Sequence, residues 1–254
     1  MNIIRLIYIC LTSLATFSVH ADSYYGTLRG LSLMELKSPY NGVVKIFESD
    51  NEKVYFNEPP FTIESYELDS KKNIIKIKID NSKAKMKRLE RDYQSAKKSF
   101  ELGYVSRSDL DTKKDAFTEA SINMEELNIE LNALERTLEL GKPVMNFRYI
   151  IRDVYTLNNQ VVSTGDTILR IENVDKFMID IKYDPVALSS RIQDKKITVK
   201  SLVTGEVFDA SVEKIYTSGD NAFHGSKMAS ILLDKHSEDL VQLLDTVFEV
   251  RIND

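Results

Sequence analysis

The chain is poor in the residues that support thiol, disulfide and metal chemistry. Its 254 residues include one cysteine, Cys10, three histidines and no tryptophan. A single cysteine excludes an internal disulfide and a metal site built from several thiolates. There are also only nine glycines and five prolines, so long regular elements can run without interruption. Hydrophobic residues make up 43% and charged residues 29%, which is typical of a folded protein.

An excess of basic residues is also missing. The formal net charge is −5, whereas nucleic-acid-binding proteins usually carry a basic surface, so no nucleic-acid partner is expected. His20 lies in the expected signal peptide, and neither His224 nor His236 has a ligand-like neighbour at helical or strand spacing, so we predict no metal site. No Ser-His-Asp arrangement, phosphate-binding loop or pair of catalytic carboxylates is recognisable. The sequence therefore predicts a protein that is not an enzyme and has no cofactor.

The only long apolar run is at the N-terminus. Arg5 precedes the apolar stretch Leu6–Phe17, and Val19-His20-Ala21 is an acceptable cleavage site for a secretory signal. The stretch is shorter than the roughly 20 residues that a membrane span needs. We predict that residues 1–21 are a cleaved signal peptide, with an uncleaved anchor as the alternative. Cleavage would also remove Cys10 and leave a mature chain without cysteine.

Two series of apolar residues at alternating spacings of three and four occupy the middle of the chain. The first runs from about Ile75 to Phe100, with Ser82 as its one polar member, and the second from Leu110 to Leu138. This spacing keeps a narrow apolar seam on one side of each helix, as in a coiled coil. The predicted seam residues are Met86, Leu89, Tyr93, Phe100, Phe117, Met124, Leu127, Leu131, Leu134 and Leu138.

A helix-stop signal and a helix-start signal lie close together between the two series. Gly103 can end the first helix in a left-handed conformation. Ser106 with Asp109 has the spacing of a capping box, and Ser108 repeats that spacing with Asp111. The two helices must therefore turn back on each other and pair antiparallel, in a rod about 50 Å long.

Two β-rich segments that resemble each other flank the predicted hairpin, at Ser38–Ser65 and Tyr149–Asn173. Each has a β-branched pair, a polar turn and a short final strand. The corresponding residues are Val43-Val44 and Ile150-Ile151, Val54 and Val161, and Ile63-Glu64 and Ile171-Glu172. An internal repeat of this kind, interrupted by the hairpin, suggests two halves of one β-unit.

The two segments resemble the half-motifs of a biotinyl or lipoyl domain. SPYNGVV and VVSTGDTILRIE carry the likeness, although Glu58-Pro59 stands in the first half where the second has Gly165-Asp166. The strands of Lys176–Asp254, with a hairpin turn at Thr204-Gly205, are similar to a small β-barrel. This order of segments resembles the periplasmic adaptor, or membrane fusion protein, family of the HlyD type.

The resemblance implies a mixed α and β, elongated fold. An antiparallel α-helical coiled-coil hairpin would be inserted in a lipoyl-like β-sandwich, which a small β-barrel would follow. A carrier lysine would sit in the turn that the hairpin replaces, which argues against an acyl or biotinyl carrier. The expected segments are the signal peptide, 1–21; N-terminal strands joining the barrel or lipoyl domain, 22–35; the first lipoyl-like half, 36–69; the hairpin, 70–142; the second half, 143–174; and the barrel, 175–254.

The resemblance also implies a function. A periplasmic adaptor, peripheral to the inner membrane, links an inner-membrane transporter of the ABC or RND type to an outer-membrane channel of the TolC type. Such adaptors serve tripartite efflux or type I secretion and assemble with copies of themselves as a ring. The expected channel-docking site is the hairpin tip, made of Gly103, Tyr104, Val105, Ser106, Arg107 and Asp109.

The tip matches only part of the family's docking motif, which is an Arg, a Leu four residues later and a Ser seven residues after that. Ser106 matches the Ser, but Ser99 and Ser95 occupy the Leu and Arg positions, with Phe100 and Lys98 nearby. Helix capping is the alternative role of Ser106. The alternative function is therefore a periplasmic binding or scaffold module that has the adaptor fold but no channel partner.

Overall fold

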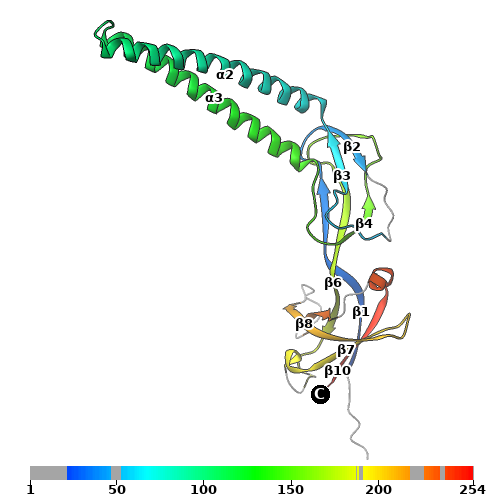
Figure 1. Cartoon of the computed structure of the whole chain (residues 1–254). Coiled ribbons are helices and arrows are strands. Elements are labelled where there is room, and N and C mark those ends of the chain that lie inside the picture. The colour runs from blue at the N-terminus through cyan, green and yellow to red at the C-terminus, as the bar shows by residue number, and fades with distance from the viewer. Residues whose placement is uncertain are drawn as a thin grey trace, which may run out of the picture.

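The computed structural model describes residues 22–46, 53–186, 188, 191–217, 226–234 and 238–253. The expected signal peptide, Cys10 and all three histidines lie outside these residues. A helical hairpin leans away from one end of two β-units that lie end to end (Figure 1). The fold is thus elongated, with α and β regions that are separate in space.

Two long strands run through both β-units and join them. Strands β1 (Asp22–Lys37) and β6 (Thr167–Tyr183) have 16 and 17 residues. They pair antiparallel from Leu28 opposite Ile179 to Lys37 opposite Thr167, with two shifts of register. Because the same two strands contribute to both units, the units are connected by a continuous β-ladder as well as by the chain.

The C-terminal unit is built on a cycle of antiparallel pairings. Strand β1 pairs with β10, and the order continues through β7, β8, β9 and β6 back to β1. The cycle surrounds one apolar core, in which Phe248 and Val199 are fully buried. The remaining elements are β7 (Lys196–Ser201), β8 (Val207–Thr217), β9 (Lys227–Leu233), β10 (Val247–Asn253) and the 3-10 helices η1 (Ile192–Asp194) and η2 (Glu238–Leu243).

The middle unit surrounds a second apolar core. A small sheet of three strands packs here against β4 and the other ends of β1 and β6. Strand β2, from the first of the two similar segments, pairs with β5 from the second. The rings of Tyr55 and Tyr149 stack in this core with centroids 5.5 Å apart. The strands are β2 (Gly42–Ile46), β3 (Phe61–Glu64), β4 (Tyr149–Val154) and β5 (Val161–Val162).

The hairpin consists of α2 (Tyr66–Glu101) and α3 (Arg107–Leu140), which confirms the two long helices that the sequence predicts. Helix α2 begins at Tyr66 rather than near Ile75. The three-and-four spacing of the seam continues toward the N-terminus through Lys72 and Leu68. Because Lys72 is charged, the apolar pattern of the sequence does not reveal this continuation. Leu68 packs against the middle core, so tertiary contacts help to stabilise the added turns.

Candidate functional site

The hairpin tip is the turn between α2 and α3. Gly103 has a φ of 79°, in the left-handed region where a side chain would be strained. The backbone N–H groups of Gly103 and Tyr104 donate to the carbonyl oxygens of Phe100 and Ser99, each at 2.9 Å. These bonds satisfy carbonyls that the last turn of a helix leaves unpaired. Gly103 therefore ends α2 in the way its position in the sequence suggests.

Ser106 caps α3. Its hydroxyl oxygen accepts from the backbone N–H of Asp109 at 3.1 Å, and its own N–H donates to the Asp109 carboxylate at 3.3 Å. This reciprocal pair is the expected capping box. The Ser106 hydroxyl also donates to Asp109 at 2.7 Å, which lowers the pKa of that carboxyl group. The second expected box is wrong, because Ser108 lies inside α3 and Asp111 pairs with Arg107 instead, at 3.1 Å.

Apolar side chains project from the tip into solvent. Leu102 is 69% exposed and Tyr104 is 80% exposed, whereas Val105 is half-buried. The guanidinium group of Arg107 lies 5.9 Å from the centre of the Phe100 ring. An exposed tyrosine and leucine beside a cation form the kind of surface that protein partners bind. Leu102 was missed by sequence reasoning, although its place just before the stop glycine was an available signal.

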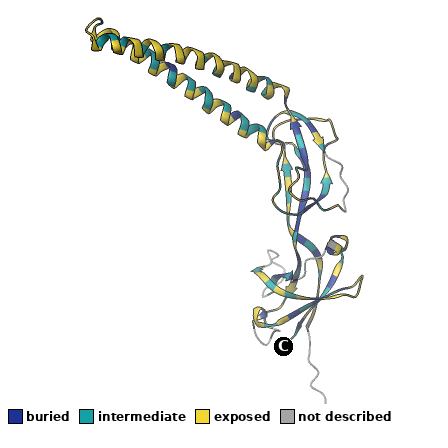
Figure 2. Cartoon of the chain, in the orientation of Figure 1, coloured by how far each residue is buried: buried dark blue, intermediate teal, exposed yellow. Residues whose placement is uncertain are grey.

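The seam between the arms is narrow. Leu134 is buried and the other nine seam residues are half-buried, while Ile75 and Ala120 are buried as well. The rings of Tyr93 and Phe117 stack across the arms with centroids 6.2 Å apart and an interplanar angle of 7°. Figure 2 shows mostly exposed helices with little buried surface between them. Two helices with nothing packed on their outer sides can bury no more than this.

Ion pairs connect the arms near the β-units. Lys72 lies 3.0 Å from the Glu135 carboxylate, with Lys76 at 3.8 Å, and Lys71 lies 3.5 Å from Glu130. The hydrogen bond from Lys72 lowers the pKa of Glu135. Exposed pairs of this kind contribute little stability individually. They do show which positions of the two arms face each other.

Tyr40 anchors the hairpin to the middle β-unit. Its hydroxyl oxygen lies 3.1 Å from the carbonyl oxygen of Ile63 and 3.3 Å from that of Leu138, in the last turn of α3. Burial raises the pKa of Tyr40. Gly141, which follows α3, packs so closely on the tyrosine that a Cβ atom would clash with the hydroxyl group. Sequence reasoning missed this contact, because Tyr40 and Gly141 are far apart in the chain.

A buried carboxylate lies where the two β-units meet. Glu172 is 2% exposed, and the backbone N–H of Gly30 donates to it at 2.6 Å. The Nε atom of Arg152 lies 3.3 Å from its other oxygen, and Arg152 also pairs with Asp245. A buried charge needs such partners, so this cluster fixes the joint between the units. In the sequence, Glu172 appears only as the last residue of a strand motif.

Neither a metal-binding cluster nor a membrane-spanning helix occurs among the described residues. They contain no group of three His, Cys, Asp or Glu residues that could hold a metal ion. None of the helices in that part of the chain combines the length and apolarity that crossing a bilayer demands.

No protein-family profile matches the sequence, and no curated protein matches it. Solved structures do match. The membrane fusion protein Spr0693 from Streptococcus pneumoniae R6 has a TM-score of 0.70 at 11% identity, over 91% of this chain and 98% of its own. MacA from Actinobacillus actinomycetemcomitans has a TM-score of 0.66 at 15% identity, over 92% of this chain and 78% of its own. ZneB from Cupriavidus metallidurans has a TM-score of 0.56 at 11% identity, over 92% of this chain and 98% of its own.

The chain has the fold of a membrane fusion protein. At these identities the likeness establishes the fold, and function must be argued from the site. Within the membrane-fusion-protein fold, the expected docking residues lie together at the far end of the hairpin, in the turn and the first turn of α3 (Figure 1), and all of them except Val105 are exposed. The expected seam residues are shielded between the arms and are structural.

Proposed function

We propose that this chain is a periplasmic adaptor subunit that links an inner-membrane transporter to an outer-membrane channel in tripartite efflux or type I secretion. The observation that carries the proposal is the exposed, capped turn at the far end of the hairpin. Helix α2 has 36 residues, which places this turn about 50 Å from the β-units. A rigid arm with an exposed apolar end is suited to reach a partner at a distance.

The other parts of the chain receive their roles from this arrangement. We assign the middle unit, from residues 36–69 and 143–174, as the lipoyl-like unit that stacks with neighbouring copies in a ring. We assign residues 175–254, whose strands complete a closed cycle of pairings together with β1, as the barrel that contacts a transporter of the ABC or RND type. The tip would contact a channel of the TolC type. The role is mechanical, so it requires neither a cofactor nor a catalytic group.

A specific observation favours the second candidate function, a scaffold module without a channel partner. Ser95 is exposed and Ser99 is half-buried where the family's docking motif has Arg and Leu. Neither serine can supply the charge or the apolar surface of those residues. Lys98, Leu102 and Tyr104 are exposed nearby and supply a cation and apolar groups instead, which is why we favour docking.

Site-specific cross-linking in cells tests the docking role. Cys10 is the only natural cysteine, so Tyr104→Cys or Arg107→Cys would introduce the only thiol after the expected signal peptide. Both variants should cross-link to an outer-membrane channel protein. Lys142→Cys, at the exposed base of the hairpin, is the matched control and should capture no channel. If the tip cysteines capture none either, the docking role is wrong and the scaffold function is favoured.

A further inference from the structure

The two arms of the hairpin carry opposite charge. Helix α2 has eleven Lys and Arg residues against six Asp and Glu residues. Helix α3 has four Lys and Arg residues against nine Asp and Glu residues. The split is strongest away from the tip, because between Lys114 and Arg136 helix α3 has six carboxylates and no cation. A hairpin with this split has a basic side and an acidic side.

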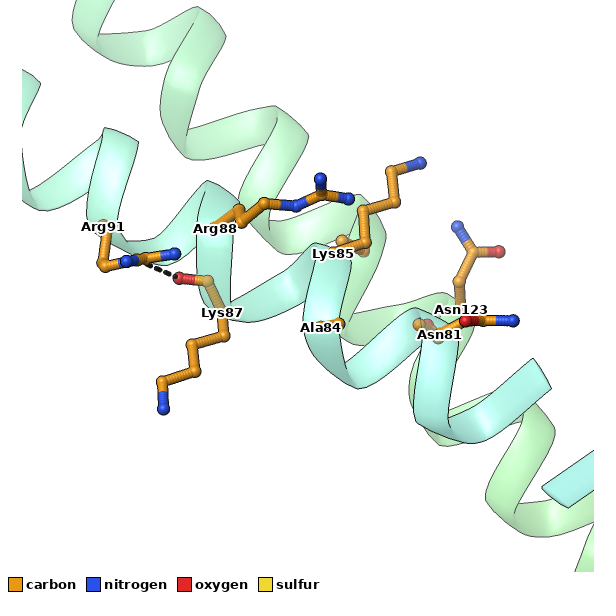
Figure 3. Close-up of a pocket in the computed structure, with 9 residues that line it drawn as sticks. Asn81, Ala84, Lys85, Lys87, Arg88, Arg91 and Asn123 are labelled. Atoms are coloured by element: carbon orange, nitrogen blue, oxygen red, sulfur yellow. Dashed lines mark hydrogen bonds between the residues drawn. The ribbon is translucent and has the colours of Figure 1, made fainter. Parts of the chain in front are cut away.

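Most of the charge in the middle of the hairpin is not neutralised by the other arm. A shallow pocket beside Ser82 and Ala120 is lined by basic side chains and no acidic one, and it includes Lys85 and Arg88. Figure 3 shows these two side chains extending to the same side of α2. Within the described residues neither Lys85 nor Arg88 forms an ion pair, and the same holds for Arg91. The ion pairs between the arms lie nearer the β-units and are those of Lys71, Lys72 and Lys76.

Each arm also has a second stripe with heptad spacing, on the side away from the seam. On α2 the stripe contains Ile74, Ile77, Ala84, Arg88 and Arg91, and on α3 it contains Glu119, Ile122, Glu126 and Ile129, all of them exposed. The four isoleucines are 54–61% exposed. A solvated outer face has no need of large apolar residues at helical spacing. We name these sets the α2 outer stripe and the α3 outer stripe.

The two outer stripes match in height along the rod. Tyr93 stacks on Phe117, and Lys72 pairs with Glu135, which fixes the antiparallel register of the arms. In this register Glu119 and Glu126 lie at about the heights of α2 residues 90 and 83, on either side of Arg88. Ile129 and Ile122 likewise lie near the heights of Ile77 and Ala84, within about one turn.

We propose that a second copy of this chain, in the same orientation, packs its α3 outer stripe against the α2 outer stripe of the first. Arg88 and Arg91 would then meet Glu119 and Glu126 of the neighbour, around a contact made by the isoleucines. Such a head-to-tail contact leaves one free stripe at each end and so continues into a row or closes into a ring. The inference rests on the proposed adaptor function, and it specifies which helix faces join neighbouring copies.

Complementary charge reversal tests the contact in the full mature chain. Arg88→Glu with Arg91→Glu makes both stripes acidic, and Glu119→Lys with Glu126→Lys makes both basic. Each double variant alone should self-associate at least about tenfold more weakly than the unaltered chain in sedimentation velocity at low salt. An equimolar mixture of the two should recover association. The acidic α2 stripe of the arginine variant then meets the basic α3 stripe of the glutamate variant, and the two unaltered stripes also match in charge. Added salt should weaken the contact.

The controls distinguish this contact from a general effect of charge on association. Lys142→Glu with Lys176→Glu makes the same change of charge as the arginine variant at exposed positions outside α2 and α3 and should leave association unchanged. All four stripe substitutions in one chain should restore self-association. If mixing and the fourfold variant both fail to restore it, the basic side binds some other acidic partner and the proposal is wrong.

Cross-linking in cells provides a second measurement, independent of concentration in vitro. Ile77→Cys and Ile129→Cys lie on the outer sides of different arms, so a short thiol linker should join two chains rather than one. With both cysteines in one chain we expect a ladder of multimers. A chain that gives no multimer and is also monomeric in sedimentation overturns the proposal. Capture of a channel through Tyr104→Cys without multimers would overturn it and leave the adaptor function standing.

Discussion

The β-units and the hairpin of this chain bury their apolar side chains to different extents. In the β-units, residues such as Leu28, Ile171 and Phe248 are fully buried in one of two cores. In the hairpin, α2 has one buried residue, Ile75, and α3 has three. Strands that surround a core can bury whole side chains, whereas two isolated helices shield only a seam. The β-units therefore hold themselves together, and the hairpin presents most of its surface to partners.

The difference should appear as unequal stability. Most helical stability in proteins comes from tertiary packing, and here packing acts on one side of each arm. Regions with few buried apolar contacts open at lower free energy than the core does. We expect the hairpin to unfold before the β-units, with its base protected longest by Tyr40 and the lysine–glutamate pairs.

The largest effect is expected from a cavity in the C-terminal core. The side chain of Phe248 is 0% exposed, and the centre of its ring lies 6.4 Å from the centre of the Phe208 ring. Phe248→Ala should lower the free energy of unfolding of the β-units by about 3–5 kcal/mol. Urea unfolding, monitored by the circular dichroism signal of the β-sheets, measures this loss of free energy. A loss below about 1 kcal/mol would mean that this core is much looser than the structure shows.

A smaller and more local effect is expected from the seam. Leu134 is 8% exposed, and Leu134→Ala should destabilise the hairpin by about 2–3 kcal/mol. Helical ellipticity should then melt at a lower temperature while the β signal stays unchanged. Asn132→Ala, on the exposed side of the same helix, is the control. If both signals shift together, hairpin and β-units are one cooperative unit and the contrast between them is wrong.

The sequence predicted the hairpin well because its signals are local. The three-and-four spacing, Gly103, and Ser106 with Asp109 each depend on neighbours within a few residues. The start of α2 was less predictable, because Lys72 occupies a seam position and is held there by Glu135 on the other arm. The second capping box does not form because Ser108 has the right spacing but is the second residue of α3, whose N-cap is Ser106.

The β-region was predictable in outline but not at its joints. The two similar segments indicated which strands belong together. The contact of Tyr40 with Gly141 and the cluster of Glu172, Gly30 and Arg152 join residues that are distant in sequence. One sequence contains no local pattern for such contacts. The residues of the outer stripes can be read from the sequence. That the two stripes match in height follows only from the register of the arms in the folded hairpin.

Acid should weaken the C-terminal unit through Asp180. Burial raises its pKa, but the Arg29 guanidinium at 2.6 Å and the Ser230 hydroxyl at 2.5 Å outweigh this and lower the pKa. A carboxyl group with a lowered pKa stabilises the fold above its unfolded pKa of about 3.9, and this stabilisation is lost as pH falls through the folded pKa.

The matching variant is Asp180→Asn. Its urea midpoint should lie below that of the unaltered chain at neutral pH, and the gap should close as pH falls below about 4. The hairpin's helical signal should not follow this change, because Asp180 lies in β6. A gap that stays constant down to acidic pH would show that the charge of Asp180 contributes nothing.

The smallest effect is expected at the tip, where it separates capping from docking. Ser106→Ala removes the cap and should destabilise the first turn of α3 by about 1 kcal/mol, seen as faster hydrogen exchange there with no change in the β-units. The pKa of Asp109 should rise toward its ordinary value. Ser106→Thr keeps the hydroxyl group and should keep the cap. If Ser106→Thr preserves exchange protection yet abolishes channel capture by Tyr104→Cys, then Ser106 itself contacts the channel; if capture persists, Ser106 acts only by holding the turn that presents Tyr104.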